Sequence, residues 1–383
     1  MDWKFLIAGK AAMNVTTDSR KVTPGCVFVA LKGEHFDGND YVEQAQRDGA
    51  AYIIRGENAL RELQDLARAW RRELALPIIA ITGTNGKTTT KELTAAVLKT
   101  KYNIHYTQGN LNNALGVPLT LLQITRSHEM AIVEMGASHP GDIRELVEIA
   151  EPDCGLITNV GRAHLQGFGS FEGVMRTKAE LYDYLRAHDG YCFRNMDNPY
   201  LQQMAGELRT VPYHTGTMPE GTHLVGEYNS ENVQAALCIG EHFGIDRETA
   251  LQAIRDYVPT NNRSQAMRTD RNELVVDAYN ANPTSMQAAI TAFRGDCFIL
   301  GEMRELGEYS HTEHQNIANM LLERKAEQVY LVGDEWQKTT APYPIFRDVE
   351  TLGIYLQQHP IQKAHILIKG SRGNQLEKII PLL

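Results

Sequence analysis

The chain has 383 residues, of which 43% are hydrophobic and 22% are charged, which is the balance of an ordinary soluble globular protein. This length predicts two or three domains. Acidic residues number 47 and basic residues 38, so the net charge of −9 argues against a broad binding surface for nucleic acid or for an anionic membrane.

The apolar segments and the cysteines exclude further classes of protein. The apolar run near the N-terminus is too short for a signal peptide, and no other run is long enough to cross a bilayer, so we expect no membrane insertion. The five cysteines form no C-x-x-C pair, which favours a reducing cytoplasm over a disulfide framework or a zinc site. They are Cys26, Cys154, Cys192, Cys238 and Cys297.

Residues 1–76 are predicted to form a small α/β domain. Residues 27–31 and 51–54 are short apolar runs typical of strands, and the segment between them has a helical pattern that ends on glycine. A charged helix over residues 58–74 then leads to Pro77, which we interpret as a domain boundary.

A phosphate-binding loop follows this boundary and is the most specific pattern in the chain. Residues 78–81 are typical of a buried strand, residues 83–88 read Gly-Thr-Asn-Gly-Lys-Thr, and a helical pattern follows. The glycines allow a tight turn with N–H groups directed at an anion, Lys87 supplies a charge for the β- and γ-phosphates, and the Thr88 hydroxyl suits Mg²⁺. The predicted ATP-binding residues here are Gly83, Thr84, Asn85, Gly86, Lys87, Thr88 and Thr89.

One feature of this loop departs from the common G-x-x-x-x-G-K-[ST] spacing. Ile81 stands where that pattern has its first glycine. A glycine-rich turn that happens to carry Lys-Thr is therefore the alternative. The strand before the loop and the helix after it favour ATP binding over that alternative.

Beyond Pro77, apolar runs alternate with helical patterns, which predicts a mainly parallel sheet with helices on its faces. Residues 259–264 have the composition of a linker, and the alternation then restarts. The predicted fold is therefore α/β with three domains: an N-terminal domain at 1–76, a central P-loop ATPase-like domain at 77–265 and a Rossmann-like C-terminal domain at 266–383.

Two candidate ligands lie where strands of the central domain are predicted to end, which is where parallel sheets bind their ligands. Glu134 ends the run at 131–135 and could hold a cation or an activating water, or could be a solvated loop carboxylate. His164 follows the run at 155–160 and is either a metal ligand or a structural histidine.

Lys178 is the unusual residue of the next predicted helix. It falls on the apolar stripe formed by Val174, Leu181, Tyr182 and Leu185. Burial lowers the pKa of a lysine, and a neutral amine can react with CO₂ to give an anionic carbamate that binds metal. From the pattern alone, a lysine that extends to water is the favoured interpretation.

Further candidates lie in the linker and the C-terminal domain. Asp277, Asn280 and Asn282 follow a predicted strand and precede a helix, so they either orient a ligand or form a capped turn. Arg263 could reach a γ-phosphate at a domain interface or could be simply exposed. Residues 369–372 repeat the strand-then-glycine pattern and could bind a carboxylate or a phosphate.

Taken together, these residues resemble the Mur ligase family, the ATP-dependent amide ligases of peptidoglycan synthesis. The loop at 83–88 is similar to the shortened phosphate loop of that family. Glu134, His164 and Lys178 match its two-magnesium site, in which the lysine is carbamylated by CO₂. The resemblance therefore implies Lys87, Glu134, His164 and Lys178 as catalytic residues, with Thr88, Glu134, His164 and carbamylated Lys178 at the metal ions.

Within the family, three segments resemble the branch that adds D-Ala-D-Ala to UDP-MurNAc-tripeptide. They are residues 109–119, 277–286 and 300–307, the last followed by His314. Residues 17–38 look like a UDP-binding domain. The resemblance implies contacts to the substrates from Ser19, Arg20, Asp37, Asn110, Asn112, Asn113, Lys369, Ser371 and Arg372, and contacts to ATP also from Arg263, Asp277, Asn280 and Asn282.

The implied reaction has two steps and uses ATP with two Mg²⁺ ions. The terminal carboxylate of the tripeptide attacks the γ-phosphate to give an acyl phosphate, and the amine of D-Ala-D-Ala then displaces phosphate. We expect a cytoplasmic monomer that binds neither nucleic acid nor membrane. The sequence leaves open whether the third residue of the peptide is lysine or diaminopimelate.

Two departures from the family pattern keep alternatives open. The stretch at 194–226 is much shorter than the family usually carries, and residues 260–263 replace the more usual Pro-Gly-Arg while keeping Arg263. The alternatives are the preceding ligase, which acts on UDP-MurNAc-dipeptide, a folylpolyglutamate-synthase-like ligase, and a nucleotide-binding relative without turnover. The Tyr-Asn-Ala-Asn-Pro segment argues against the first, the N-terminal motifs argue against the second, and Glu134, His164 and Lys178 argue against the third.

Overall fold

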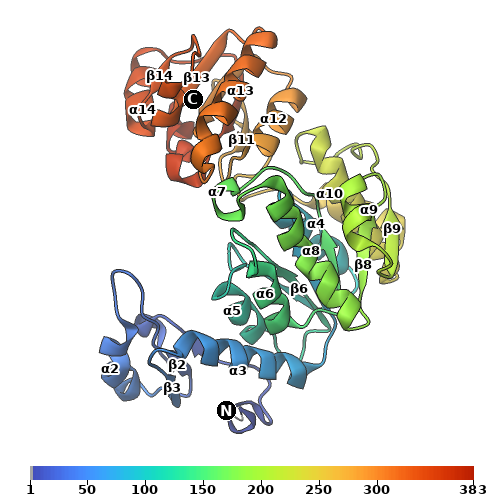
Figure 1. Cartoon of the computed structure of the whole chain (residues 1–383). Coiled ribbons are helices and arrows are strands. Elements are labelled where there is room, and N and C mark those ends of the chain that lie inside the picture. Colours follow the sequence, from blue (N-terminus) through green and yellow to red (C-terminus); the bar gives the residue numbers. More distant parts are fainter. Residues whose placement is uncertain (1–2) are drawn as a thin grey trace.

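The computed structural model describes residues 3–383, which form three α/β units arranged along one curved molecule (Figure 1). The N-terminal unit holds a three-stranded parallel sheet in the order β1-β2-β3. Its elements are α1 (Lys4–Ile7), β1 (Val15–Thr16), β2 (Val27–Val29), α2 (Val42–Arg47) and β3 (Tyr52–Ile54).

The helix α3 (Ala59–Leu74) joins the N-terminal unit to the central one. It lies alongside α5 (Gly116–Leu122) and α6 (Asp142–Ala150) of the central unit, as Figure 1 shows. The indole of Trp70 is fully buried and donates a hydrogen bond of 2.8 Å to the carbonyl of Ile124. The guanidinium of Arg71 lies 2.9 Å from the carboxylate of Asp153, so polar contacts as well as apolar packing fix α3 on the central unit.

The central unit is built on a six-stranded parallel sheet in the order β5-β6-β4-β7-β8-β9. Its strands are β4 (Ile78–Thr82), β5 (Ile104–Tyr106), β6 (Met130–Glu134), β7 (Cys154–Ile157), β8 (Tyr191–Asn195) and β9 (Thr210–Tyr213). All five residues of β4 are buried, since helices cover both faces of the sheet. This explains the continuous apolar run that precedes the phosphate loop.

Alternate side chains of β4 enter two different cores. Ile79 and Ile81 pack with α4 (Lys87–Leu98), α10 (Ser230–His242) and α11 (Arg247–Asp256) on one face. Ile78 and Ala80 pack on the other face with α3 and with a second group of helices. These are α5 (Gly116–Leu122), α6 (Asp142–Ala150), α8 (Phe171–Ala187) and α9 (Pro199–Ala205), while the short α7 (Leu165–Phe168) precedes α8.

The stretch at 194–226, shorter than the family pattern, ends the central sheet at an edge strand. Here β9 pairs with β8 on one side and has no partner strand on the other within residues 3–383. It is four residues long and contains Pro212, which lacks a backbone donor. Short length and proline both limit the pairing of an edge strand with a strand of another molecule. The central sheet therefore ends at a strand that is poorly suited to such pairing.

The C-terminal unit has a six-stranded sheet in the order β10-β11-β15-β12-β13-β14, parallel except for β10. The strands are β10 (Gln265–Arg268), β11 (Glu273–Asp277), β12 (Cys297–Gly301), β13 (Gln328–Val332), β14 (Ile345–Phe346) and β15 (His365–Lys369). The helices are α12 (Pro283–Ala292), α13 (Ser310–Glu323) and α14 (Val349–Gln358). The predicted α/β class with mainly parallel sheets is confirmed.

None of the helices within residues 3–383 combines the length and the apolar character needed to cross a membrane.

Candidate active site

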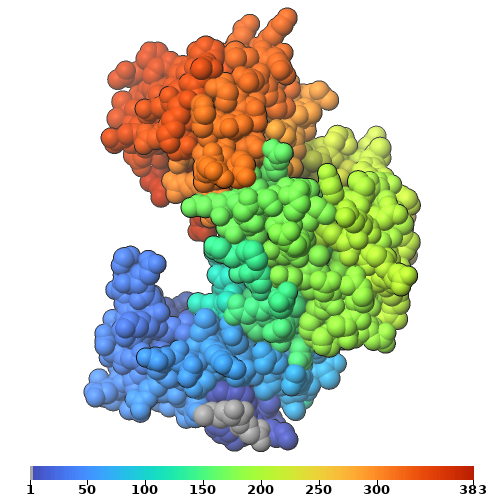
Figure 2. Space-filling model, viewed as in Figure 1, coloured from blue at the N-terminus to red at the C-terminus, as the bar shows by residue number. Residues whose placement is uncertain are grey.

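A cavity of about 860 Å³ lies between the central and C-terminal units. Its walls come from the loops after β4, β6 and β7 of the central sheet and after β11 and β15 of the C-terminal sheet. In the view of Figure 2, the surface is hollowed between the blue N-terminal unit and the orange C-terminal unit. The carboxyl ends of both parallel sheets therefore face one shared site, as expected for such sheets.

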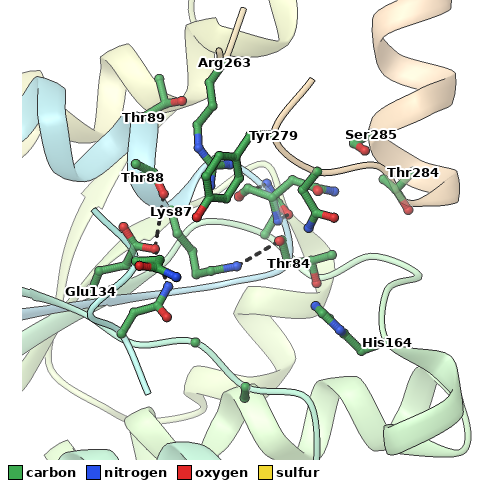
Figure 3. Close-up of a pocket in the computed structure, with 18 of the residues that line it drawn as sticks. Thr84, Lys87, Thr88, Thr89, Glu134, His164, Arg263, Tyr279, Thr284 and Ser285 are labelled. Atoms are coloured by element: carbon green, nitrogen blue, oxygen red, sulfur yellow. Dashed lines mark hydrogen bonds between the residues drawn. The ribbon is translucent and has the colours of Figure 1, made fainter. Parts of the chain in front are cut away.

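The phosphate loop adopts a conformation that its glycines make possible. Gly83 has φ +142° and Gly86 has φ +81°, and a Cβ atom at Gly83 would lie 2.0 Å from Oγ1 of Thr158. Lys87 Nζ donates to the carbonyls of Gly83 at 2.8 Å and Thr84 at 3.0 Å (Figure 3). Burial lowers the pKa of Lys87 to about 8, and the nearby charge of Glu134 partly opposes that shift.

Glu134 lies at the end of β6 beside this loop and is buried, unlike a solvated loop carboxylate. Its Oε1 accepts hydrogen bonds from Thr88 Oγ1 at 3.2 Å and from Asn112 Nδ2 at 2.8 Å. Its Oε2 has no hydrogen-bond partner within residues 3–383, although Lys91 Nζ lies 3.9 Å away. A buried oxygen without a donor is costly unless another ligand satisfies it.

This corner of the cavity fits a hard cation. Mg²⁺ takes oxygen ligands and usually keeps several waters and phosphate oxygens. The free Oε2 of Glu134 and the hydroxyl of Thr88 supply two protein oxygens. No group of three or more His, Cys, Asp or Glu side chains suited to a metal was found in the described part of the chain, so a cation here needs ligand oxygens from a nucleotide or from water.

His164 and Lys178 both lie near one aromatic ring. The ring centroid of Phe168 is 6.2 Å from that of His164 and 5.6 Å from Nζ of Lys178. The ring of His164 lines the cavity and contacts the carboxylate of Glu305 in the C-terminal unit, whereas Lys178 is buried on α8 and does not line the cavity. Burial, followed by the charge of Lys87, holds the pKa of Lys178 well below its usual range.

The predicted residues of the linker and the C-terminal unit meet the phosphate loop from the opposite side. Asn282 Nδ2 donates to Oδ1 of Asn85 at 2.8 Å, which joins the two units directly. The Arg263 guanidinium lies 4.0 Å from the ring centroid of Tyr279, and Figure 3 shows both side chains reaching toward the phosphate loop. The turn between β11 and α12 therefore contributes residues to the cavity and also caps the helix.

Two further predicted residues of this unit form an ion pair in which the lysine is buried. Lys369 Nζ lies 2.5 Å from Oδ2 of Asp277 and also donates to the carbonyl of Asn280 at 3.2 Å. Lys369 is 1% exposed and ends β15, and its partner Asp277 ends the neighbouring strand β11, so the pairing of these two strands places the two side chains together. Ser371 and Arg372 follow it and also line the cavity.

The predicted substrate residues divide between two regions. Asn110, Asn112 and Asn113 line the cavity on the central side. Ser19, Arg20 and Asp37 belong to the N-terminal unit and do not line this cavity. The structure therefore brings the ATP-type residues together and leaves the predicted UDP-type residues on a separate surface.

Several residues in or beside the site were not predicted from the sequence. Lys91 is fully buried beside Glu134, and Asn232 accepts a hydrogen bond from Thr90 behind the phosphate loop. Glu305 contacts His164, and Glu313 pairs with Arg162. Lys91 could have been found from its place one helical turn after Lys87, but the other partners depend on how the units pack.

Comparison with known proteins agrees with this geometry. Family models for the "Mur ligase middle domain", the "Mur ligase, glutamate ligase domain" and the "Mur ligase family, catalytic domain" match residues 81–222, 262–372 and 12–104. The UDP-N-acetylmuramoyl-tripeptide–D-alanyl-D-alanine ligase of Bacillus subtilis is 34% identical over 96% of this chain and 92% of its own length. The enzyme of the same name from Escherichia coli is 31% identical over 96% and 93%.

Solved structures give the same result. MurF from Acinetobacter baumannii superposes with a TM-score of 0.85 at 28% identity and covers 96% of this chain and 92% of its own. MurF ligase from Thermotoga maritima in complex with ADP gives 0.86 at 27% identity, with 97% of both chains covered. The chain therefore belongs to the Mur ligase family and is an ATP-dependent ligase that forms a peptide bond.

Proposed function

We propose that this chain joins D-Ala-D-Ala to UDP-MurNAc-tripeptide, with ATP converted to ADP and phosphate. The observation that supports this most is the cavity in which the phosphate loop of the central unit meets the segment after β11 at the Asn85–Asn282 hydrogen bond. Relatives that match this chain over nearly its whole length carry this activity in their names.

ATP binds between the two units in this proposal. The N–H groups of the loop from Gly83 to Thr89 surround its phosphates, and Lys87 turns from the carbonyls it now contacts toward the β- and γ-phosphates. Arg263, Asp277, Asn280 and Asn282 act from the linker and the C-terminal unit. This division of labour follows the proposed domains at 1–76, 77–265 and 266–383.

Two Mg²⁺ ions are proposed to accompany the nucleotide. Thr88 and Glu134 hold one, since their oxygens meet beside the phosphate loop. His164 and Lys178 hold the other, with Lys178 as a carbamate: its neutral amine bonds to the carbon of CO₂ and releases a proton. When bound, the ions neutralise the repulsion between a carboxylate and a triphosphate.

The chain's own residues then serve two bond-forming steps. The tripeptide carboxylate attacks the γ-phosphorus and ADP leaves, while Lys87 and Arg263 stabilise the charge on the transferred group. The amine of D-Ala-D-Ala next attacks the acyl carbon and phosphate leaves. Asn110, Asn112 and Asn113 orient the peptide, and Lys369, Ser371 and Arg372 hold the carboxylate of the dipeptide.

The N-terminal unit is proposed to bind the UDP part of the substrate through Ser19, Arg20 and Asp37. These residues lie outside the cavity, as an anchor for the remote end of a long substrate requires. We further propose a monomer that acts in the cytoplasm, where ATP is available, without nucleic-acid or membrane partners.

A phosphate-release assay tests the proposal. Release that requires ATP, UDP-MurNAc-tripeptide and D-Ala-D-Ala together supports it, and parallel assays with lysine or diaminopimelate at position three identify the natural peptide. Release with UDP-MurNAc-dipeptide and a free amino acid favours the preceding ligase, and release with a folate-type acceptor favours the folylpolyglutamate reaction. ATP binding without release under any of these conditions contradicts an enzymatic role.

A further inference from the structure

An ion pair crosses from the central unit to the C-terminal unit beside the cavity. Nη1 of Arg162, in the loop after β7, lies 3.0 Å from Oε1 of Glu313 in the first turn of α13. The side chain of Glu313 is only 4% exposed, whereas that of Arg162 is 61% exposed. Within residues 3–383, Arg162 is the ion-pair partner found for this carboxylate. Neither residue lines the cavity.

The same segment makes two further hydrogen bonds to the C-terminal unit, and we call residues 161–166, which include the first two residues of α7, the docking loop. The backbone N–H of Arg162 donates to Oγ1 of Thr284 at 3.0 Å. A Cβ atom at Gly161 would lie 2.9 Å from that same oxygen, so the side chain of Thr284 leaves little room for a side chain at Gly161. The N–H of Gln166 donates to the carbonyl of Glu305 at 3.3 Å.

The position of the docking loop matters because it carries His164, which lines the cavity. His164 itself contacts Glu305 of the C-terminal unit, and the backbone contacts on either side of it are single hydrogen bonds, each of which contributes modestly in net free energy. The Arg162–Glu313 pair adds a charged contact, and a buried carboxylate that loses its partner is strongly disfavoured. Separation of the two units would break this pair and the contacts to Thr284 and Glu305 together.

We propose that Arg162 and Glu313 are positioning residues that hold the docking loop, and with it His164, against the C-terminal unit in the catalytically competent arrangement. The inference rests on the proposed function in one respect only: ATP must bind in the cavity between the two units. It assigns neither residue any contact with substrate or nucleotide. It predicts that the pair acts on domain arrangement and through it on turnover.

The test uses charge removal and charge exchange in the full chain. Glu313→Gln and Arg162→Gln are each expected to raise the Kd for ADP and the KM for ATP about tenfold, the size of a coupling between charges in contact. The double variant Arg162→Glu/Glu313→Arg is expected to recover most of that loss. Small-angle scattering of the unliganded protein should show a larger radius of gyration for each single variant than for the wild type.

A matched pair within the C-terminal unit provides the control. Lys378 Nζ also lies 3.0 Å from its partner Glu350, but this pair is exposed and does not cross between units. Lys378→Gln should leave ADP affinity and the radius of gyration unchanged. Because Glu313 is buried, the charge exchange could fail to fold, so the Glu313→Gln and Arg162→Gln variants decide the matter alone if thermal unfolding shows that they are intact.

Affinities and scattering curves of both single variants within twofold and within error of the wild type would overturn the proposal. So would a loss of turnover with unchanged ADP affinity and radius. These readouts need no acceptor substrate. They therefore remain valid if D-Ala-D-Ala proves to be the wrong acceptor, and a failure of the proposed function is distinguishable from a failure of the proposed positioning role.

Discussion

The hydroxyl of Thr88 donates a hydrogen bond to Oε1 of Glu134, 46 residues further along the chain. This contact joins the first turn of α4 to the end of β6. It places the neutral hydroxyl of Thr88 and the buried carboxylate of Glu134 side by side next to the phosphate loop. Oε2 of Glu134 lacks a hydrogen-bond donor within residues 3–383. We therefore propose that the pair shares a cation with a bound triphosphate, and a magnesium titration tests this.

Glu134→Gln should raise the Mg²⁺ concentration needed for half-maximal ligase activity by about tenfold or more, because an amide keeps the size of the side chain but removes its charge. A magnesium titration at saturating ATP measures this. Glu92→Gln is the matched control, since Glu92 lies on α4 near Lys91 but does not line the cavity. Identical magnesium curves for wild type and Glu134→Gln would remove Glu134 from the metal site.

Lys87→Ala should lower ATP turnover by about 10²-fold or more, because a preorganised charge on the transferred phosphoryl group is lost. Steady-state phosphate release measures this. Lys99→Ala, at the opposite end of the same helix, should retain the wild-type rate, because Lys99 contacts Tyr106 rather than the cavity. A near-normal rate for Lys87→Ala would contradict the assignment of the phosphate loop.

The parts of this molecule that the sequence predicts are the local ones. The apolar run of β4, the glycines of the phosphate loop and the strand before Asp277 depend on neighbours in the chain, so their patterns are visible without a structure. The strands β1, β5, β8, β9, β10 and β14 are not predicted; all of them except the five-residue β8, which lies inside the central sheet, have two to four residues and lie at a sheet edge. At such positions, pairing partners decide the conformation.

The same distinction applies to the site. The residues that line the cavity at the ends of strands, among them Glu134 and Lys369, are predicted because parallel sheets collect ligands there. The partners Glu305 and Glu313 are not predicted, because they reach His164 and Arg162 only through the packing of one unit on another. No periodicity in one segment encodes such a contact.

Lys178→Ala should nearly abolish ligase activity, and added bicarbonate should not restore it. Lys178 is buried, and the low pKa of its amine leaves a nucleophile that can capture CO₂. Wild-type protein in ¹³C-bicarbonate is expected to show a carbamate carbon signal in NMR spectra that Lys178→Ala lacks. Full activity of Lys178→Ala, or the same carbon signal in both proteins, would contradict the carbamate.

His314 provides a pH dependence that can be worked out from its contacts. The ring is fully buried, Nε2 accepts a hydrogen bond of 3.0 Å from the N–H of Met303, and Nδ1 lies 2.7 Å from the carbonyl of Ser310. Only the neutral ring with its proton on Nδ1 satisfies both contacts. Burial lowers the pKa of His314, while the Ser310 contact and the charges of Glu335 and Glu302 oppose the shift and that of Lys338 adds to it.

The sign of the effect follows from proton binding. Below pH about 6.5 the unfolded chain protonates this histidine, while the folded protein does not until a lower pH is reached. The unfolded state therefore binds more protons in that window, and the free energy of unfolding falls as the pH falls, by at most about 1.4 kcal/mol per pH unit for this one group.

Urea denaturation at several pH values between 7.5 and 5.5 measures this slope of the free energy of unfolding against pH. His314→Gln, which cannot titrate, should show a shallower slope than the wild type. Parallel curves for wild type and His314→Gln would contradict the proposal that the folded protein keeps the His314 ring neutral in this pH range.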